Sequence, residues 1–406
     1  MRKINTLSFV RATRSTPRDI NRRIALNLVR EHQPISRADL ARRMRIGRGV
    51  VTSLVKELLD AGAIYEGATA DAPRGRRPMM LYVRTRDRLA IAIDVRFSRT
   101  YIMLGDFSAN QIALESFETV FDPAELLEQL VLRIRRMIET HGAHGRCEGI
   151  GLVVPGMVDR QSGRVLNSPQ LGWHDVDICD DLAERTGLTV HIENAPFACA
   201  LAQMWLGQRG GDGLGDFVYV TVSDGVGAGV VVNGQIVRGH NHTAGEFGHV
   251  AVDPAGPLCL CGAYGCLEAY TSNLATVARY LGRDVGSDGV RELLATMPLT
   301  ITDLMARASS GDERAAAALA DTGRYLGRGL AVIINALNPS RIFIGGEITA
   351  AWDRIAPLIR AAVAERALTA AAAATPIIPE PPGSYPRLRG ATALVAAPAF
   401  AAPQVA

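Results

Sequence analysis

The first 86 residues show apolar positions at the spacing of short amphipathic helices. One helix is predicted over residues 19–30, and Pro34 ends it. A second begins at Ser36, because a serine followed three residues later by Asp39 is a capping-box pattern. A third follows Gly47. The apolar residues expected to face the core are Ile20, Ile24, Leu26, Leu28 and Val29 on the first helix and Val50, Val51, Leu54, Leu58 and Leu59 on the third.

Two predicted strands joined by a basic loop, "IYEGATADAPRGRRPMMLYV", follow the third helix. Three helices and a basic hairpin are typical of a winged helix-turn-helix, whose third helix enters the major groove of DNA while the wing contacts the backbone or the minor groove. The same pattern would suit a small packing domain whose arginines only increase solubility. The residues expected to contact DNA are Ser36, Arg37, Arg48, Thr52, Ser53, Lys56, Arg74, Arg76 and Arg77.

The distribution of charge along the chain favours DNA binding over that alternative. Residues 1–86 contain 19 Lys or Arg and 7 Asp or Glu, whereas the other residues contain 25 and 34. The formal net charge of +3 therefore hides a basic N-terminal part and an acidic remainder. A basic head of this kind suggests binding to a polyanion, and the acidic body is expected to serve a different purpose.

The length and composition place the chain among soluble proteins of more than one domain. Its 406 residues suit two or three domains, and 48% hydrophobic with 21% charged residues is typical of globular proteins. No apolar run reaches the ~20 residues of a membrane helix, and the N-terminus lacks the apolar core of a signal peptide. We therefore expect a cytoplasmic protein with no membrane partner, whose thiols are reduced and available to metals.

From residue 87 onward the pattern changes to strands that alternate with helices, and a strand–turn–strand theme occurs twice. Residues 89–114 and residues 217–237 each carry it, and Asn233-Gly234 marks a tight hairpin turn in the second. A repeated theme of this kind predicts two similar lobes that face a cleft. In sugar kinases and actin-like ATPases such hairpins hold nucleotide phosphates, although glycine-rich turns alone are weak evidence for this.

Three of the six cysteines lie within eight positions, in "CLCGAYGC". With His249 ten residues upstream, Cys259, Cys261 and Cys266 offer four ligands, the number that a closed tetrahedral zinc site needs. Buried, unreactive cysteines are the alternative, but these would not be expected to cluster in a polar, glycine-rich loop. A reducing compartment disfavours a disulfide. The cysteines expected to be ordinary core residues are Cys147, Cys179 and Cys199.

Six segments of the body resemble the ROK family of repressors, open reading frames and kinases. They read "VVPGMVD", "LNSPQLGW", "GVGAGVVVNGQIVRG", "AGEFGH", "CLCGAYGCLE" and "LNPSRIFIGGEI". The winged helix-turn-helix of residues 1–86 places the resemblance in the repressor branch. It implies an α/β fold whose body has two lobes of the actin-like, sugar-kinase-like (ribonuclease H-like) type. Lobe 1 would span residues 87–205 and lobe 2, with the zinc loop, residues 206–406, and the C-terminal helix is expected to pack back on lobe 1.

The resemblance also implies a metal and a ligand. In the family the matching histidine and three cysteines bind a structural zinc, so one Zn²⁺ per chain is expected. The same histidine and neighbouring glutamates hold sugar hydroxyls in the family. A metal-bound imidazole has a fixed ring orientation, and the metal would thereby shape a sugar pocket. The residues that match the family's sugar site are Asn194, Glu246, His249 and Glu268.

Three parts of the body depart from the pattern of ROK kinases. In "IENAPFACAL", Ala195 replaces the aspartate that serves kinases as general base, a group typically worth ~10²–10⁴ in rate. Phe197 replaces an asparagine, and the missing aspartate suggests either a ligand that is altered there or a site made less polar by Phe197. Arg96 and Phe97 replace small residues of the first phosphate loop, and Asp224 replaces a threonine. Bulk and negative charge are therefore expected where phosphates would lie, and no catalytic residue is assigned.

These patterns predict a sugar-responsive DNA-binding transcriptional regulator, expected to be a repressor, that senses a sugar or sugar derivative without phosphorylating it. A two-fold DNA operator would need a homodimer or homotetramer. One alternative is a ROK sugar kinase with an added DNA-binding domain, which ATP-dependent turnover of a sugar would support. The other is a regulator whose body binds another protein, or nothing, in place of a sugar. Thermal shifts against a panel of sugars separate this second alternative from sugar sensing.

Overall fold

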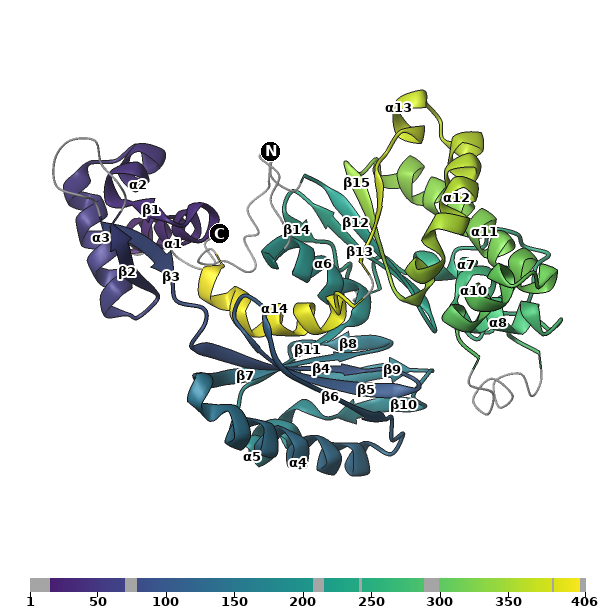
Figure 1. Ribbon diagram of the computed structural model, residues 1–406, viewed down its shortest axis with the longest axis horizontal. Coiled ribbons are helices and arrows are strands. Elements are labelled where there is room, and N and C mark those ends of the chain that lie inside the picture. The colour runs from purple at the N-terminus through teal and green to yellow at the C-terminus, as the bar shows by residue number, and fades with distance from the viewer. Residues whose placement is uncertain are drawn as a thin grey trace.

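The chain folds into a small head and two larger lobes (Figure 1). In that view the head lies on the left, lobe 1 below and lobe 2 on the right. The computed structural model describes residues 15–69, 79–206, 215–240, 243–287, 299–381 and 383–401.

The head contains three helices and an antiparallel sheet of strand order β1-β3-β2. Its elements are α1 (Thr16–His32), β1 (Ile35–Ser36), α2 (Arg37–Met44), α3 (Arg48–Asp60), β2 (Ile64–Thr69) and β3 (Met79–Val83). The predicted start of α2 is confirmed, because Ser36 Oγ accepts a hydrogen bond from Asp39 N at 3.1 Å. Three helices followed by a strand pair are consistent with the predicted winged helix-turn-helix.

Two of the predicted core positions in the head were wrong. Ile24 and Val50 are 44% and 51% exposed. Ala25 on α1 and Val55 on α3 are fully buried instead. On both helices the buried face differs from the face that carries the largest apolar side chains. The buried face is the one that packs against neighbouring elements.

Lobe 1 is built on a five-stranded sheet of order β11-β7-β4-β5-β6, with β11, β7 and β4 parallel and β5 and β6 antiparallel to their neighbours. These strands are β4 (Arg88–Val95), β5 (Arg99–Asp106), β6 (Gln111–Glu118), β7 (Arg146–Val154) and β11 (Val190–Asn194). A smaller antiparallel sheet contains β8 (Met157–Asp159), β9 (Arg164–Ser168) and β10 (Trp173–Asp177). On one face of the large sheet lie α4 (Pro123–His141), η1 (Gly142–His144) and α5 (Cys179–Thr186).

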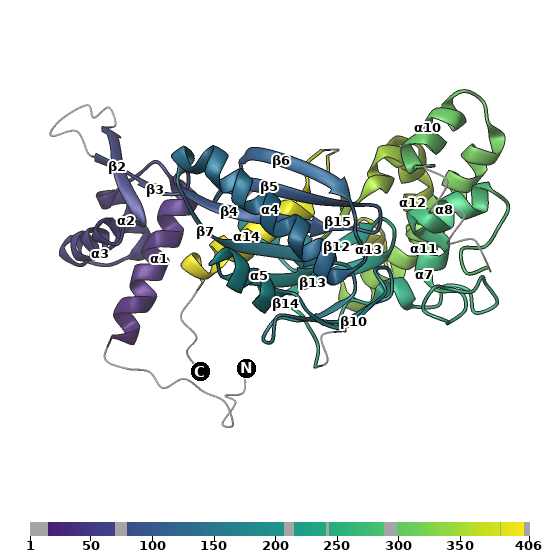
Figure 2. The ribbon, with the colours of Figure 1, turned by 90° about the horizontal axis from the view of Figure 1, so that it is seen from below.

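Lobe 2 repeats this topology, as its sheet of order β14-β13-β12-β15-β16 shows. The strands are β12 (Phe217–Val222), β13 (Val226–Val232), β14 (Gln235–Ile236), β15 (Arg341–Gly345) and β16 (Ile377–Pro379). The helices are η2 (Phe247–His249), α7 (Leu267–Thr271), α8 (Asn273–Tyr280), α10 (Ile301–Ser309), α11 (Glu313–Leu337), η3 (Glu347–Ala351), α12 (Trp352–Arg366) and α13 (Ala370–Ala373). In Figure 2 the helices α10, α11 and α12 stand at the end of the molecule opposite the head. The predicted pair of similar lobes is therefore confirmed.

Two further helices, α6 (Ala195–Leu206) and α14 (Pro386–Phe400), lie between the lobes. Helix α6 packs on both sheets, because Ala198 belongs to the core on lobe 1 and Cys199 to the core on lobe 2. Helix α14 returns to lobe 1, as expected, and places Ala391 beside Val153 of β7. Its last residue, Phe400, lies in the core of the head. The domain boundaries at residues 86 and 205 stay predictions.

None of the helices in the described ranges is both long enough and apolar enough to cross a membrane.

The tight contact between α14 and α6 generates a first prediction. A Cβ on Gly390 would overlap the carbonyl oxygen of Ala198, whereas a Cβ on Gly142 would meet nothing within 4 Å. Alanine normally stabilises a helix relative to glycine, but overpacking typically costs about 1–3 kcal/mol. We therefore expect Gly390→Ala to lower the thermal midpoint Tm and Gly142→Ala, the control, to leave it unchanged. A Tm for Gly390→Ala at or above that of the wild type would contradict the close contact.

Candidate effector cavity and metal centre

A cavity of about 170 Å³ lies between the two lobes. The end of β11 and the start of α6 supply Asn194 and Ala195, while lobe 2 supplies Glu246, His249 and Glu268. The four residues predicted to bind a ligand therefore line one cavity. This grouping depends on the fold, because Asn194 ends β11, Glu246 and His249 lie at the two ends of η2, and Glu268 lies on α7.

The glutamates are held by lobe 2 with their carboxylates at the cavity. Glu268 Oε2 accepts a hydrogen bond from Val226 N at 2.8 Å. Glu246 Oε2 lies 3.9 Å from His249 Nε2. Burial raises the pKa of both carboxyl groups. Two carboxyl groups at one end of a small cavity offer hydrogen-bond acceptors to hydroxyl groups of a ligand, and the imidazole offers a ring nitrogen whose donor or acceptor role depends on its tautomer.

The start of α6 has a different role from that expected for Phe197. Asn194 Oδ1 accepts a hydrogen bond from Phe197 N at 3.1 Å and thus caps the helix. The Phe197 ring is buried away from the cavity, and the Arg238 guanidinium lies 5.1 Å from its centroid. The expectation that this ring makes the site less polar was therefore wrong, because a helical residue two positions after Ala195 points to another face.

The four predicted metal ligands come together at the side of the cavity. The ligand atoms of His249, Cys259, Cys261 and Cys266 lie within 4.8 Å of one another. The sulfur atoms of Cys261 and Cys266 are 3.7 Å apart, and Cys259 Sγ lies 3.9 Å from His249 Nδ1. A tetrahedral zinc with Zn–S bonds of about 2.3 Å separates its ligands by about 3.7 Å. The cluster therefore fits a metal ion of this kind, with Nδ1 of His249 toward the sulfurs and Nε2 toward Glu246.

The other cysteines lie apart from this cluster. Cys179 and Cys199 are buried in the cores of the lobes, and Cys147 is partly buried. Burial raises the pKa of all three thiols. They are core residues, as the sequence predicted.

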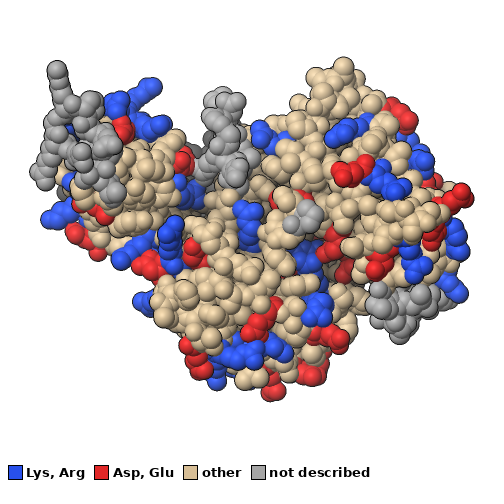
Figure 3. Space-filling view, viewed as in Figure 1, with Lys and Arg blue, Asp and Glu red and all other residues tan. Residues whose placement is uncertain are grey.

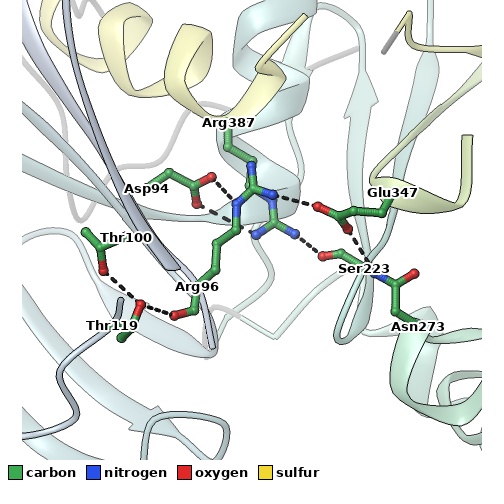
Figure 4. A network of polar contacts seen from close by, with 8 residues as sticks. All are labelled: Asp94, Arg96, Thr100, Thr119, Ser223, Asn273, Glu347 and Arg387. Atoms are coloured by element: carbon green, nitrogen blue, oxygen red, sulfur yellow. Dashed lines mark hydrogen bonds and ion pairs between the residues drawn. The ribbon is translucent and has the colours of Figure 1, made fainter. Parts of the chain in front are cut away.

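At the other end of the cavity, two arginines join the lobes (Figure 4). Arg96 Nε donates to Asp94 Oδ2 at 2.6 Å within lobe 1, and Arg96 Nη1 donates to Glu347 Oε1 at 2.6 Å on lobe 2. Arg387 Nη2, from the first turn of α14, donates to Ser223 Oγ of lobe 2 at 2.5 Å. Its Nη1 lies 3.7 Å from Asp94 Oδ1. We call Asp94, Arg96, Ser223, Glu347 and Arg387 the cleft network.

Burial makes the charges of the cleft network depend on one another. Burial alone would lower the pKa of Arg96, but the Asp94 and Glu347 carboxylates raise it. Burial likewise opposes ionisation of Glu347, yet Arg96 and Arg387 lower its pKa. Asp224 beside the network is less well compensated, since burial and the Glu347 charge raise its pKa to about 6. The arginines are thus neutralised inside the protein.

Lys and Arg side chains lie on the surface of the head (Figure 3), and part of the predicted DNA-contacting set is exposed. Ser36 is buried, and its hydroxyl donates to Asp39, so its role in the structure is to cap α2. Arg37 is half-buried and forms an ion pair with Glu66 at 2.9 Å. The exposed members on α3 are Arg48, Thr52, Ser53 and Lys56. The predicted wing residues Arg74, Arg76 and Arg77 lie outside the described residues.

The model of the ROK family matches residues 90–397. The chain belongs to the ROK family. One relative is the DNA-binding transcriptional dual regulator NagC of Escherichia coli K12, which is 30% identical over 363 residues that cover 89% of this chain and 88% of NagC. A putative xylose repressor of Caldicellulosiruptor sp. is 30% identical over 358 residues, with coverage of 86% and 88%.

Solved structures of the ROK family resemble the chain to different extents. A ROK family transcriptional regulator, described as a homologue of the E. coli MLC protein, has a TM-score of 0.77 at 28% identity and covers 95% of this chain and 97% of its own. A ROK hexokinase from Thermus thermophilus has a TM-score of 0.57 at 26% identity and covers 97% of its own chain but 75% of this one. The regulator therefore matches nearly the whole of this ROK chain, whereas a quarter of it has no counterpart in the kinase.

Sequence reasoning missed two parts of the site. Arg387 lines the cavity, but it lies in a C-terminal segment rich in alanine and proline that gave no pattern to interpret. On the head, Arg43 and Arg45 are exposed next to the start of α3. The run of arginines in "ARRMRIGR" was the available signal for these two.

The raised pKa of Asp224 generates a second prediction. Above pH 6 the folded protein buries an ionised carboxylate, which costs as much as about 3 kcal/mol for a shift of about two units. Below that pH the native carboxyl group becomes protonated, so the cost falls as the pH falls and is absent only below the pKa of the unfolded carboxyl group, about 3.9. Asp224→Asn should therefore raise Tm relative to the wild type, and by more at pH 8 than at pH 5. The control is Glu128→Gln, an exposed carboxylate on α4. An equal Tm difference at the two pH values would contradict the burial of an uncompensated charge.

Proposed function

We propose that this ROK chain is a sugar-responsive DNA-binding transcriptional regulator, and that it acts as a repressor. The observation that carries the proposal is a head of three helices and a strand pair joined to a ROK body, in which Ala195 would stand at the position of the kinase base. Relatives that cover most of the chain include an N-acetylglucosamine repressor of E. coli and a xylose repressor of Caldicellulosiruptor bescii. The proposed partners are a double-stranded DNA operator and a sugar or sugar derivative.

The head would contact DNA through the exposed face of α3. Arg48 and Lys56 would supply positive charge, while Thr52 and Ser53 offer hydroxyl groups to bases or phosphates. The wing arginines would add contacts with the backbone. One head offers few phosphate contacts, so a homodimer or homotetramer that reads a pseudo-palindromic operator is proposed.

The body would sense its ligand without phosphorylating it. A methyl group at Ala195 accepts no proton, and the cleft network joins its arginines to internal carboxylates at the end of the cavity where phosphates are expected. Phosphoryl transfer depends on positioning phosphates and neutralising their charge. The arginines of the cleft network are already paired with carboxylates of the protein. The competing function is a ROK sugar kinase with an added DNA-binding domain. It needs a test because a ROK hexokinase is among the solved structures that resemble the chain.

The Cys₃His cluster would hold one structural Zn²⁺. Its chemistry would be positional, because a metal on Nδ1 of His249 leaves Nε2 in a fixed orientation at the cavity. Leu260 and Cys261 of the same loop line the cavity wall. The metal would thus support the loop against which a sugar packs.

The decisive experiment follows two quantities in the full-length protein. Thermal shifts against neutral sugars that include N-acetylglucosamine and D-xylose identify a ligand. Anisotropy titrations then measure the affinity for a duplex selected by the unliganded protein from a randomised pool. One sugar should raise Tm and change the duplex affinity by about 5- to 150-fold. Duplex binding that no sugar changes, or ATP-dependent formation of a sugar phosphate, would overturn the proposal.

Glu246 generates a third prediction. Its carboxylate lies at the cavity with fewer structural contacts than that of Glu268, so it can be changed with less risk to the fold. Glu246→Gln keeps the shape and removes the charge. Hydrogen bonds to charged groups are worth about 1.5–3 kcal/mol, so sugar affinity measured by calorimetry should fall roughly 10- to 100-fold. Unaltered affinity in this variant, with Glu128→Gln as the control, would place the sugar elsewhere.

The metal cluster generates a fourth prediction. Elemental analysis of the native protein should find about one zinc per chain. Cys261→Ser should lose the metal and lower Tm, because a structural zinc contributes directly to the stability of its loop. It should also weaken sugar binding, since loss of the metal frees the His249 ring. Cys147→Ser, outside the cluster, should retain metal and sugar affinity. Native protein without zinc would refute the metal assignment.

A further inference from the structure

Two helices run from the wall of the cavity to the head. Helix α6 begins with Ala195 and Pro196, which line the cavity, and its last turn carries Trp205. Helix α14 carries Arg387, also in the cavity wall, in its first turn and ends at Phe400. The helices contain 12 and 15 residues and so span about 18 and 22 Å. They pack against each other along their lengths (Figure 1).

One arginine of the head contacts the far end of both helices. The guanidinium of Arg30, on α1, lies 4.6 Å from the centroid of the Trp205 ring and 5.0 Å from that of Phe400. Arg30 Nη1 also donates to the carbonyl oxygen of Trp205 at 3.4 Å. A planar guanidinium can stack on aromatic rings and donate hydrogen bonds at the same time, and a lysine ammonium cannot do both.

Other side chains of α1 cap the end of α14. Arg23 Nη1 donates to the carbonyl oxygens of Pro398, at 3.0 Å, and Ala399. Asn27 Nδ2 donates to the carbonyl oxygen of Phe400 at 2.8 Å. Carbonyl groups in the last turn of a helix lack partners within the helix, so these donors from the head satisfy them. The Phe400 side chain is 4% exposed and completes the core of the head.

Helix α14 fits closely against lobe 1 and against α6, while α6 also fits closely against β13 of lobe 2. A Cβ on Gly151 of β7 would overlap the carbonyl oxygen of Ala391, and one on Gly390 would overlap that of Ala198. Helix α14 therefore has no room to shift over the sheet of lobe 1 without repacking. Its link to lobe 2 at the cavity is the hydrogen bond from Arg387 to Ser223, a polar contact that can break without repacking a core.

We propose that α14 holds the DNA-binding head to lobe 1, with α6 packed alongside it between the lobes and with Arg30 as the coupling residue. An effector that changes the position of lobe 1 relative to lobe 2 would then also reposition the head on DNA. The inference rests on the proposed function, in which a sugar binds between the lobes and changes the affinity for DNA.

The test compares variants of the full-length protein in the presence of the selected duplex and the sugar that gives the largest thermal shift. Arg30→Ala should reduce the effect of the sugar on duplex affinity at least about fivefold, while sugar affinity without DNA stays within about twofold. In Arg30→Lys, which keeps the charge, the effect of the sugar on duplex affinity should lie between that in Arg30→Ala and that in the wild type. Arg22→Ala removes the same charge from the outer surface of α1 and should keep the wild-type response. An unchanged response in Arg30→Ala overturns the proposal.

Hydrogen exchange separates a failure of this inference from a failure of the proposed function. Without sugar or DNA, the amides of residues 399–401 should exchange faster in Arg30→Ala than in the wild type, because a detached head lets the last turn of α14 fray. If no sugar changes DNA binding by the wild type, the proposed function is wrong. The attachment of the head through Arg30 is then tested by the exchange of these amides alone. Faster exchange in Arg30→Ala supports it, and equal rates in the two proteins overturn it.

Discussion

The buried carboxylate of Asp94 is the group on which the arrangement of the cleft depends. Its side chain is fully buried, and a buried carboxylate is costly unless it is paired with a positive group. Arg96 provides that partner from the same lobe, and Arg387 approaches from α14. Each arginine then contacts lobe 2, through Glu347 and Ser223. Compensation of one buried charge therefore places the two arginines that connect lobe 1 and the start of the C-terminal helix to lobe 2.

The opposite end of the same cavity is organised by the cysteine loop. Gly262 and Gly265 have φ values of +89° and +70°, which favour glycine and let the loop turn tightly. The turns bring Cys261 and Cys266 together beside His249. One end of the cavity is therefore shaped by ion pairs and the other by potential metal ligands, and the space between them remains open to a neutral polar ligand.

The sequence predicts those elements that depend on neighbouring residues in the chain. It does not predict which side chains are buried, because burial depends on packing between distant elements. The capping pattern at Ser36, the hairpin at Asn233-Gly234 and the spacing of the cysteines each depend on neighbouring residues, and the structure contains all three. Ile24 and Val50 were misplaced because exposure depends on which neighbouring elements cover a face. Helix α14 is buried around most of its circumference, so it shows no amphipathic period. Its two consequential residues, Arg387 and Phe400, therefore had no signal in the sequence.

The contacts of the cleft network differ in how far they are exposed to solvent. A ligand shifts a conformational equilibrium only by its difference in affinity for the two states, and a small sugar has few hydrogen bonds to offer. The Glu347 side chain is 42% exposed, although Asp94 is buried, so the ion pair that crosses to lobe 2 is partly solvated. Partly exposed pairs contribute modestly to stability, on the order of 1 kcal/mol. The strong pairing of Asp94 thus stays within lobe 1, and the weaker contacts that cross the cleft are those that a sugar could outweigh.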